Sequence, residues 1–470
     1  MSEPTFKIRG FNMCESILRH SPEQLRQFIR RMKVLRMNTL IVHYDYGWNR
    51  YKDIILEETE KAGVEVTLMT FGPRTFYKYT DWKPEWFARK NDGSLFTDTL
   101  ECETQPCRFQ PEGLKAFAYG AREWLKELPP QIKRVHMRAA DGLDFCQCER
   151  CRVMPDHEKW QPFVEAFVDA VVETRPELDF ETDVYVKRYN LSADQKAHRK
   201  MTRIMYDTFF RHSHVPIGVE SWNKETVRAA ATESDPDATS PNVYHANRLR
   251  EWCDAMPCKI YIHENAMGQS LQGVFQHNTG IMIKDLELYR SLGVSGICYE
   301  AYEPGYLNFE KHFEVLAKAM INLDDFKNYT PSEFEKEVTT KWRMELFCDI
   351  KEFPLDKYLN DPVELEHAQH FRRCWTNPSP QAYRDYVYFA FEHEDVLDPL
   401  FIGFFNALWG IDKGKLDFSD ASENSQLLLS HRKLWDFMEH VPNDQNPISV
   451  SKNLILDLAE KVKAINKDNK

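Results

Sequence analysis

Short apolar runs alternate with longer amphipathic stretches along this chain as far as about residue 320. Eight of the apolar runs have the length and residue content of buried strands, and they lie at residues 6–14, 38–45, 64–73, 132–141, 179–189, 202–212, 258–265 and 295–305. Stretches with helical periodicity separate most of them, for example residues 21–36 and 49–63. This alternation restricts the region to an α/β fold built on a parallel sheet.

The number of predicted strands favours one architecture within that class. Eight strands predict a closed (β/α)8 barrel of the TIM type over residues 1–325. A doubly wound open sheet also alternates strands and helices, but no predicted strand is followed by a G-x-G-x-x-G turn. Beyond residue 325 the strand signals stop, and amphipathic stretches such as 331–347 and 451–467 follow. The sequence therefore predicts an all-helical C-terminal domain over residues 326–470.

Charge and hydropathy limit the classes of partner. The 61 basic and 73 acidic residues give a net charge of −12, which argues against nucleic acid or an anionic membrane as the main partner. The start, MSEPTFKIRGFN, has no apolar segment of a signal peptide, and the longest apolar run, LFIGFFNALWGI, is too short to span a bilayer. We expect a cytoplasmic protein, although a removed leader would leave the same pattern. The oligomeric state stays open.

Three of the eleven cysteines form a compact C-x-C-x-x-C motif, Cys146, Cys148 and Cys151, and Cys107 precedes it on a neighbouring loop. Four thiolates would suit a closed structural zinc site. Free or partly oxidised thiols are an alternative reading, because an odd number of cysteines in a long chain is typical of a reducing compartment. A catalytic redox motif is a third reading. The spacing alone does not decide among them.

Catalytic residues of TIM-type barrels lie at the carboxyl ends of the strands. The predicted strand ends carry a mixture of carboxylates, aromatic rings and cations, whereas a G-x-S-x-G, an H-E-x-x-H and a Walker A motif are absent. Glycosidic bond cleavage needs such a mixture, since one group protonates the leaving oxygen and a second assists at the anomeric carbon. The simpler alternative is that these side chains are solvated or cap helices. The candidates are Arg9, His43, Asp45, Trp48, Arg138, Asp141, Asp183, Tyr185, Tyr206, Arg211, Glu264, Asn265, Glu300, Tyr302 and Glu303.

Several of these motifs resemble those of known glycoside hydrolases. IRGFNM, MNTLIVHYDYGWNR and GVEVTLMTFGP are similar to strand motifs of the family 20 β-N-acetylhexosaminidases. ADGLDFCQCERC, HSHVP, YIHEN and LGVSGICYE more closely resemble the domain-of-unknown-function 4838 group, which includes the family 163 endo-β-N-acetylglucosaminidases and is distantly related to the family 67 α-glucuronidases. The resemblance covers residues 5–320 and implies a carbohydrate substrate with no cofactor for catalysis.

The resemblance also implies individual roles. Asp141 matches the hexosaminidase aspartate that orients the substrate acetamido group, but Gly142 stands where the family has its acid. We therefore expect the acid to come from another strand, with Glu264 as first choice and Glu300 as second. The remaining implied roles are sugar-hydroxyl binding by Arg9 and Asp45, and stacking by Trp48, Tyr206 and Tyr302.

The sequence thus favours a retaining glycoside hydrolase that cleaves β-linked N-acetylhexosamine-containing glycans by substrate assistance. One alternative is an inverting enzyme of the α-glucuronidase type, in which Glu264 and Glu300 flank a water. Another is a glycan-binding pseudoenzyme, which the glycine at position 142 makes reasonable. A zinc-scaffolded interaction protein is a third.

Overall fold

The computed structural model describes residues 3–330 apart from gaps at 14–16, 18–21, 101–103, 142–144, 186–187, 193, 210, 212–215, 220–240, 265–278 and 301–309. The helical domain predicted over 326–470 lies almost wholly outside the described residues. One compact unit, the barrel, is made up of Met1–Ala266, Met282–Tyr302 and Glu314–Lys327. Among the helices of the described residues, none combines the length and the apolar character needed to cross a membrane.

The barrel consists of eight parallel strands, each hydrogen-bonded to the next, and β8 closes the ring by pairing with β1. This closed order confirms the predicted (β/α)8 barrel. The strands are β1 (Ile8–Met13), β2 (Thr39–His43), β3 (Glu65–Phe71), β4 (Arg134–Arg138), β5 (Asp179–Val184), β6 (Ile204–Asp207), β7 (Ile260–Glu264) and β8 (Gly296–Glu300).

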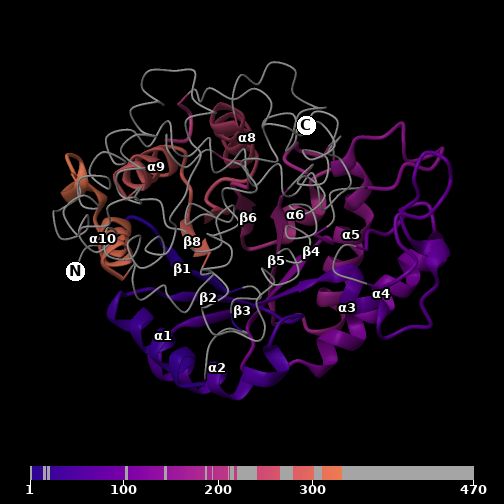
Figure 1. Cartoon of the computed structure of the whole chain (residues 1–470), viewed down its shortest axis with the longest axis horizontal. Coiled ribbons are helices and arrows are strands. Elements are labelled where there is room, and N and C mark those ends of the chain that lie inside the picture. Colours follow the sequence, from indigo (N-terminus) through magenta and orange to yellow (C-terminus); the bar gives the residue numbers. More distant parts are fainter. Residues whose placement is uncertain are drawn as a thin grey trace, which may run out of the picture. The chain divides into compact units, whose positions relative to one another are not determined.

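Helices follow the strands along the chain and surround them (Figure 1). A helix is described after every strand, although α6, between β5 and β6, is a single short turn. The helices of the barrel are α1 (Pro22–Val34), α2 (Trp48–Ala62), α3 (Gly72–Tyr77), α4 (Pro111–Glu127), α5 (Asp156–Thr174), α6 (Lys196–Lys200), α8 (Pro241–Ala255), α9 (Thr279–Ser291) and α10 (Glu310–Ile321).

Two glycines show how the sequence sets this geometry locally. Gly63 ends α2 with a φ of 69°, a left-handed conformation that glycine adopts without steric cost, and its N–H bonds the carbonyl of Glu60. Gly10 lies in β1 where a Cβ would stand 1.8 Å from the Thr39 carbonyl oxygen. Any larger residue at position 10 would therefore push β1 away from β2.

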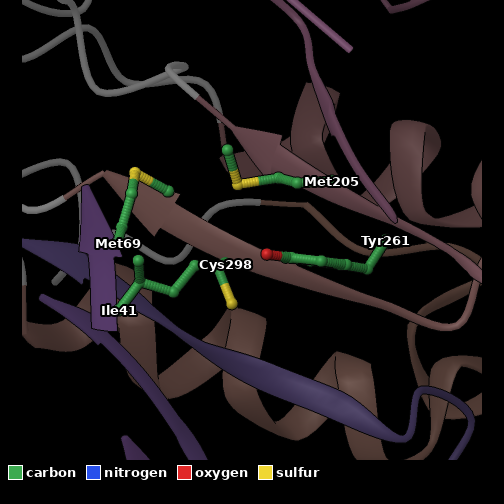
Figure 2. Close-up of a cluster of buried hydrophobic side chains, with 5 residues drawn as sticks. All are labelled: Ile41, Met69, Met205, Tyr261 and Cys298. Carbon is green, nitrogen blue, oxygen red and sulfur yellow. The ribbon is translucent and has the colours of Figure 1, made fainter. Parts of the chain in front are cut away.

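An apolar layer crosses the interior of the barrel (Figure 2). Because side chains alternate along a strand, each strand sends every second residue inward. Side chains from β2, β3, β6, β7 and β8 meet in this layer and are fully buried: Ile41, Met69, Met205, Tyr261 and Cys298.

A buried charged group lies toward the strand starts, and we call Arg134, His136, Glu181 and Arg203 the floor cluster. Glu181 binds Arg203 through one oxygen and His136 Nδ1 through the other, the latter at 3.0 Å. Arg203 Nη2 also donates to Thr67 Oγ1 at 2.6 Å. Burial raises the pKa of Glu181, but Arg203 and His136 outweigh burial and lower it to about 2. Glu181 is therefore ionised at neutral pH.

Candidate active site

The strand ends carry a second polar layer just beyond the apolar one. On four strands the inward residue two positions after the apolar side chain is polar or charged, as in Ile41–His43, Met205–Asp207, Tyr261–His263 and Cys298–Glu300. These positions are the carboxyl ends of parallel strands, where TIM-type barrels hold their catalytic groups. We call Asn12, Arg138, Asp183, Asp207, His263 and Glu300 the mouth cluster.

His263 lies at the centre of the mouth cluster, between two carboxylates. Its Nδ1 contacts Asp207 Oδ2 at 2.8 Å, and its Nε2 contacts Glu300 Oε2 at 2.5 Å. Asn12 Nδ2 donates to the same Glu300 oxygen at 2.9 Å. Burial lowers the pKa of His263, but Asp207 and Glu300 outweigh burial and raise it to about 10. At neutral pH the ring is thus an imidazolium that donates to both carboxylates.

Arg138 joins this triad to the next strands. Its guanidinium lies 2.9 Å from Asp183 and 3.2 Å from Asp207, and 4.0 Å from the centre of the Tyr185 ring. Burial lowers the pKa of Arg138, yet the surrounding carboxylates, with Asp183 the strongest, hold it well above its usual value. Arg138 therefore stays charged and fixes the carboxylates of β5 and β6.

Asp141 follows β4 and is exposed to solvent. Its charge contributes to the raised pKa of Arg138 and, after burial, to that of Tyr185, so it lies close to both groups. Gln105 Nε2 donates to the Ala140 carbonyl at 3.0 Å, which ties the backbone just before Asp141 to another loop. Asp141 is thus an accessible carboxylate on a braced backbone.

Glu264, the first-choice acid, lies in a different environment. It is 2% exposed. Its Oε2 accepts from Arg211 at 3.0 Å and from Tyr289 at 2.9 Å, while Oε1 accepts from Thr208 at 3.1 Å. Arg211 also binds Asp285 of α9 at 2.6 Å. Glu264 therefore points outward from β7 toward α9, with both oxygens engaged.

Two predicted sugar-binding residues also point away from the mouth. The Arg9 guanidinium donates to the carbonyls of Phe6 at 2.7 Å and of Arg36 at 3.0 Å, both of which precede strands. The Tyr206 hydroxyl contacts His245 Nδ1 of α8 at 3.2 Å, outside the barrel. The structure does not bring either residue to the mouth cluster.

The β2 candidates are largely packed. Asp45 accepts from the Phe71 N–H at 2.9 Å and the Thr75 hydroxyl at 2.9 Å, so it braces the turn after β3. Trp48 begins α2 and is 3% exposed. His43 lies beside Phe71 at the strand end, and burial holds its pKa well below the usual value. The remaining candidates Asn265, Tyr302 and Glu303 lie outside the described residues.

Three members of the mouth cluster, Asn12, Asp207 and His263, lie at predicted strand ends but have no role among the sequence-derived assignments. The signal that identifies them is the two-residue alternation of strands. His263 shares the inward row of Tyr261, whereas Glu264 falls on the outward row. Choosing the polar residue on the inward row of each strand would have selected His263 over Glu264 and Asp207 over Tyr206.

The cysteine motif closes into a cluster at the edge of this region. The sulfur atoms of Cys107, Cys146, Cys148 and Cys151 all lie within 4.8 Å of one another. Cys107 Sγ is 3.9 Å from Cys148 Sγ and 3.8 Å from Cys151 Sγ. The four predicted ligands are therefore brought together, and the cluster has the composition and size to hold a metal ion.

Comparisons with known proteins give structural similarity only. No family model and no curated protein matches the chain. Among solved structures, an O-GlcNAc hydrolase variant from Thermobaculum terrenum is similar at 11% identity and a TM-score of 0.42, covering 99% of this chain and 96% of that one. A β-N-acetylhexosaminidase is similar at 12% identity and a TM-score of 0.41, covering 72% of this chain and 76% of that one. A chitobiase from Flavobacterium johnsoniae is similar at 10% identity and a TM-score of 0.41, covering 96% of this chain and 78% of that one. At such identities no residue role transfers to this chain.

Proposed function

We propose that the chain is a glycoside hydrolase whose active site is the mouth of the barrel. The observation that carries the proposal is the Asp207–His263–Glu300 triad, a protonated imidazole ring held between two buried carboxylates where the strands end. Glycosidases need a carboxyl group that is supplied with a proton at neutral pH. The floor cluster also contains a histidine bound to a carboxylate, but on β4 and β5 its residues precede those of the mouth cluster by two positions.

In this proposal Glu300 is the general acid, and His263 is its positioning residue. The short contact lets the proton on His263 Nε2 pass to Glu300, which delivers it to the leaving glycosidic oxygen. Asp207 then holds the neutral ring through its Nδ1–H. In the second step Glu300 takes a proton from the attacking water and returns it to His263 Nε2. Glu264 is a less suitable acid because Arg211, Tyr289 and Thr208 occupy its oxygens.

The finer proposal is a retaining reaction on β-linked N-acetylhexosamine-containing glycans with substrate assistance. The acetamido oxygen attacks the anomeric carbon as the bond to the leaving oxygen breaks, and water opens the resulting ring. Asp141 orients the acetamido N–H. The sequence resemblance supports this substrate class, and the exposure of Asp141 beside Arg138 is compatible with its role. No cofactor takes part in the chemistry.

The test compares Glu300→Gln with Glu264→Gln, two carboxylates that are each 2% exposed. Substrates are β-N-acetylglucosaminides, β-N-acetylgalactosaminides and α-glucuronides, each with an activated aryl leaving group and with a sugar leaving group. Removing the acid should slow cleavage of the sugar-linked substrate about 10²–10⁴-fold. An activated phenolate leaves without a proton, so its release should change much less. Glu264→Gln should show no such dependence on the leaving group.

Several outcomes would contradict parts of the proposal. If only Glu264→Gln loses more activity on the sugar-linked substrate than on the activated aryl substrate, the general acid is Glu264 of β7 and not Glu300. Turnover of only the α-glucuronide would overturn the substrate class and favour the inverting alternative. If wild type cleaves neither this panel nor natural N-acetylglucosamine-containing glycans, the chain is not the proposed hydrolase.

A further inference from the structure

We propose that the four-cysteine cluster is a structural zinc site that clamps two loops at the β4 edge of the mouth. The first loop, between α3 and α4, supplies Cys107. The second, between β4 and α5, supplies Cys146, Cys148 and Cys151. The zinc assignment stands on the cluster itself, and only its effect on turnover rests on the proposed hydrolase function.

The sulfur spacing fits a tetrahedral metal better than a disulfide. Zinc–sulfur bonds of about 2.3 Å in a tetrahedron place sulfur atoms about 3.8 Å apart. The observed 3.9 Å from Cys107 to Cys148 and 3.8 Å from Cys107 to Cys151 match that edge. A disulfide requires sulfurs about 2.05 Å apart. Each thiol would have to move substantially to pair with another.

The donor set selects the kind of metal. Four sulfur ligands and no oxygen ligand disfavour magnesium and calcium, which bind oxygen, and suit zinc in a closed site with no position left for a substrate. Cys107, Cys146 and Cys151 are each at most 2% exposed, so the site is sheltered from solvent. Zinc at this position would therefore be structural, not catalytic.

The backbone around the cluster is already arranged as a ligand shell. The Arg89 N–H points at Cys146 Sγ at 3.4 Å, the kind of contact that stabilises a metal-bound thiolate. The N–H groups of Cys151 and Arg152 both bond the Cys148 carbonyl at 2.9 Å. This turn brings Cys148 and Cys151 to the same side of their loop.

Besides the cysteine cluster, polar contacts join the two loops to each other and to their neighbours. They include the Gln105 Nε2 bond to the Ala140 carbonyl at 3.0 Å, the Gln147 N–H bond to the Arg89 carbonyl at 2.6 Å and the Arg150 guanidinium over the Phe109 ring at 3.8 Å. Few apolar side chains pack against the cysteines, Phe96 and Phe109 among them. Segments with so small a core commonly depend on a metal or disulfide for their stability.

The cysteine cluster is connected to the mouth cluster through the backbone around Asp141. That residue lies between the end of β4 and the first cysteine of the motif, and Gln105, two residues before Cys107, bonds the Ala140 carbonyl at 3.0 Å. Both loops therefore fix the backbone that presents Asp141. Loss of the metal should loosen this backbone while leaving the triad of β6, β7 and β8 in place.

The test measures metal in protein purified under reducing conditions, by elemental analysis, for wild type, Cys148→Ser and Cys258→Ser. Cys148 is the least buried ligand, and Cys258 is an exposed thiol outside the cluster. We expect one zinc per chain in wild type and Cys258→Ser, and at least about tenfold weaker zinc retention against a chelator in Cys148→Ser. Cobalt substitution should give the visible and near-ultraviolet bands of a tetrahedral tetrathiolate site, a readout independent of activity and of any variant.

Zinc below one tenth of the chain concentration, bound iron in place of zinc, or disulfides among the four cysteines would overturn the site. Equal metal loss in both variants would show that the cluster does not hold it. If Cys148→Ser fails to fold, the wild-type zinc content and the cobalt spectrum still decide the question.

Removing zinc from wild type should lower turnover at least about tenfold, with recovery on re-addition. Unchanged turnover in zinc-free protein would overturn the clamp while leaving both the zinc site and the hydrolase standing.

Discussion

The mouth cluster and the floor cluster are two buried charged networks inside one barrel, and they differ in their position along the strands. Each holds one histidine, at least one arginine and at least one carboxylate. The apolar layer of Ile41, Met69, Met205, Tyr261 and Cys298 occupies the interior between strand starts and strand ends. Burial and perturbed pKa values therefore do not mark an active site by themselves. Position at the carboxyl ends of the strands does.

The two clusters also distribute their protons differently. In the floor cluster Glu181 is satisfied by Arg203, His136 and the Tyr261 hydroxyl, the last at 2.7 Å. In the mouth cluster His263 contacts two carboxylates from different strands, so each of its two ring N–H groups has a carboxylate acceptor. We infer that the first arrangement holds the barrel together, whereas the second can move a proton to a substrate.

The largest expected effect on stability comes from breaking the floor cluster. Arg203→Met leaves Glu181 buried with only part of its compensating charge, which typically costs about 3–5 kcal/mol of unfolding free energy. Denaturant unfolding of wild type and variant measures the loss. Arg199→Met, at an exposed position nearby, is the control and should stay within about 0.5 kcal/mol of wild type. Equal effects at both positions would remove the distinction between the floor cluster and the surface.

Asp207→Asn tests the proton supply of the mouth cluster. Asp207 is the largest favourable influence on the raised pKa of His263, so its neutralisation should lower that pKa from about 10. We expect kcat to fall about 100-fold and the alkaline limb of its pH profile to move to lower pH. NMR titration of the His263 ring checks the cause. A fall in kcat with an unchanged ring pKa would contradict the positioning role of His263.

Acid stability should report the floor cluster. The pKa of Glu181 is about 2 in the folded protein and ordinarily 4.5, so its contribution is fully present above pH 4.5 and is lost as pH falls toward 2. Glu181→Gln should therefore flatten the dependence of unfolding free energy on pH in that window. Glu300→Gln serves as the comparison variant. An unchanged slope in Glu181→Gln would show that this carboxylate does not govern acid unfolding.

The smallest expected effect concerns Arg9. Because its guanidinium binds carbonyls that precede β1 and β2, Arg9→Lys should cost about 1 kcal/mol of unfolding free energy. KM for a glycoside substrate should not change. Steady-state kinetics and thermal unfolding separate the two roles, since a sugar ligand would raise KM with little loss of stability.

Much of the barrel could be predicted from the sequence because strand and helix periods are local signals. The runs at residues 38–45 and 258–265 contain β2 and β7, and Gly63 ends α2 as its position predicts. The site was harder to predict, because it depends on which of two adjacent residues faces inward. His263 and Glu264 are neighbours in the chain, yet one joins the mouth cluster and the other binds Arg211.

Local sequence patterns also could not predict which groups each side chain binds. Arg9 follows the start of β1 and has the charge expected of a residue that binds sugar hydroxyls. Its guanidinium instead donates to the carbonyls of Phe6 and Arg36. The cysteine cluster was more predictable, since three ligands lie in one short motif. Only Cys107 had to be brought from another loop.

The most direct measurement is kcat for sugar-linked substrate in Glu300→Gln and Glu181→Gln, with the unfolding free energy of the same two proteins. Both substitutions remove one buried carboxylate without changing its size. We predict that Glu300→Gln loses about 10²–10⁴-fold in kcat, whereas Glu181→Gln loses stability and keeps kcat within about threefold where it is folded. Equal losses of kcat in the two proteins, or a loss confined to Glu181→Gln, would contradict the assignment of chemistry to the mouth cluster.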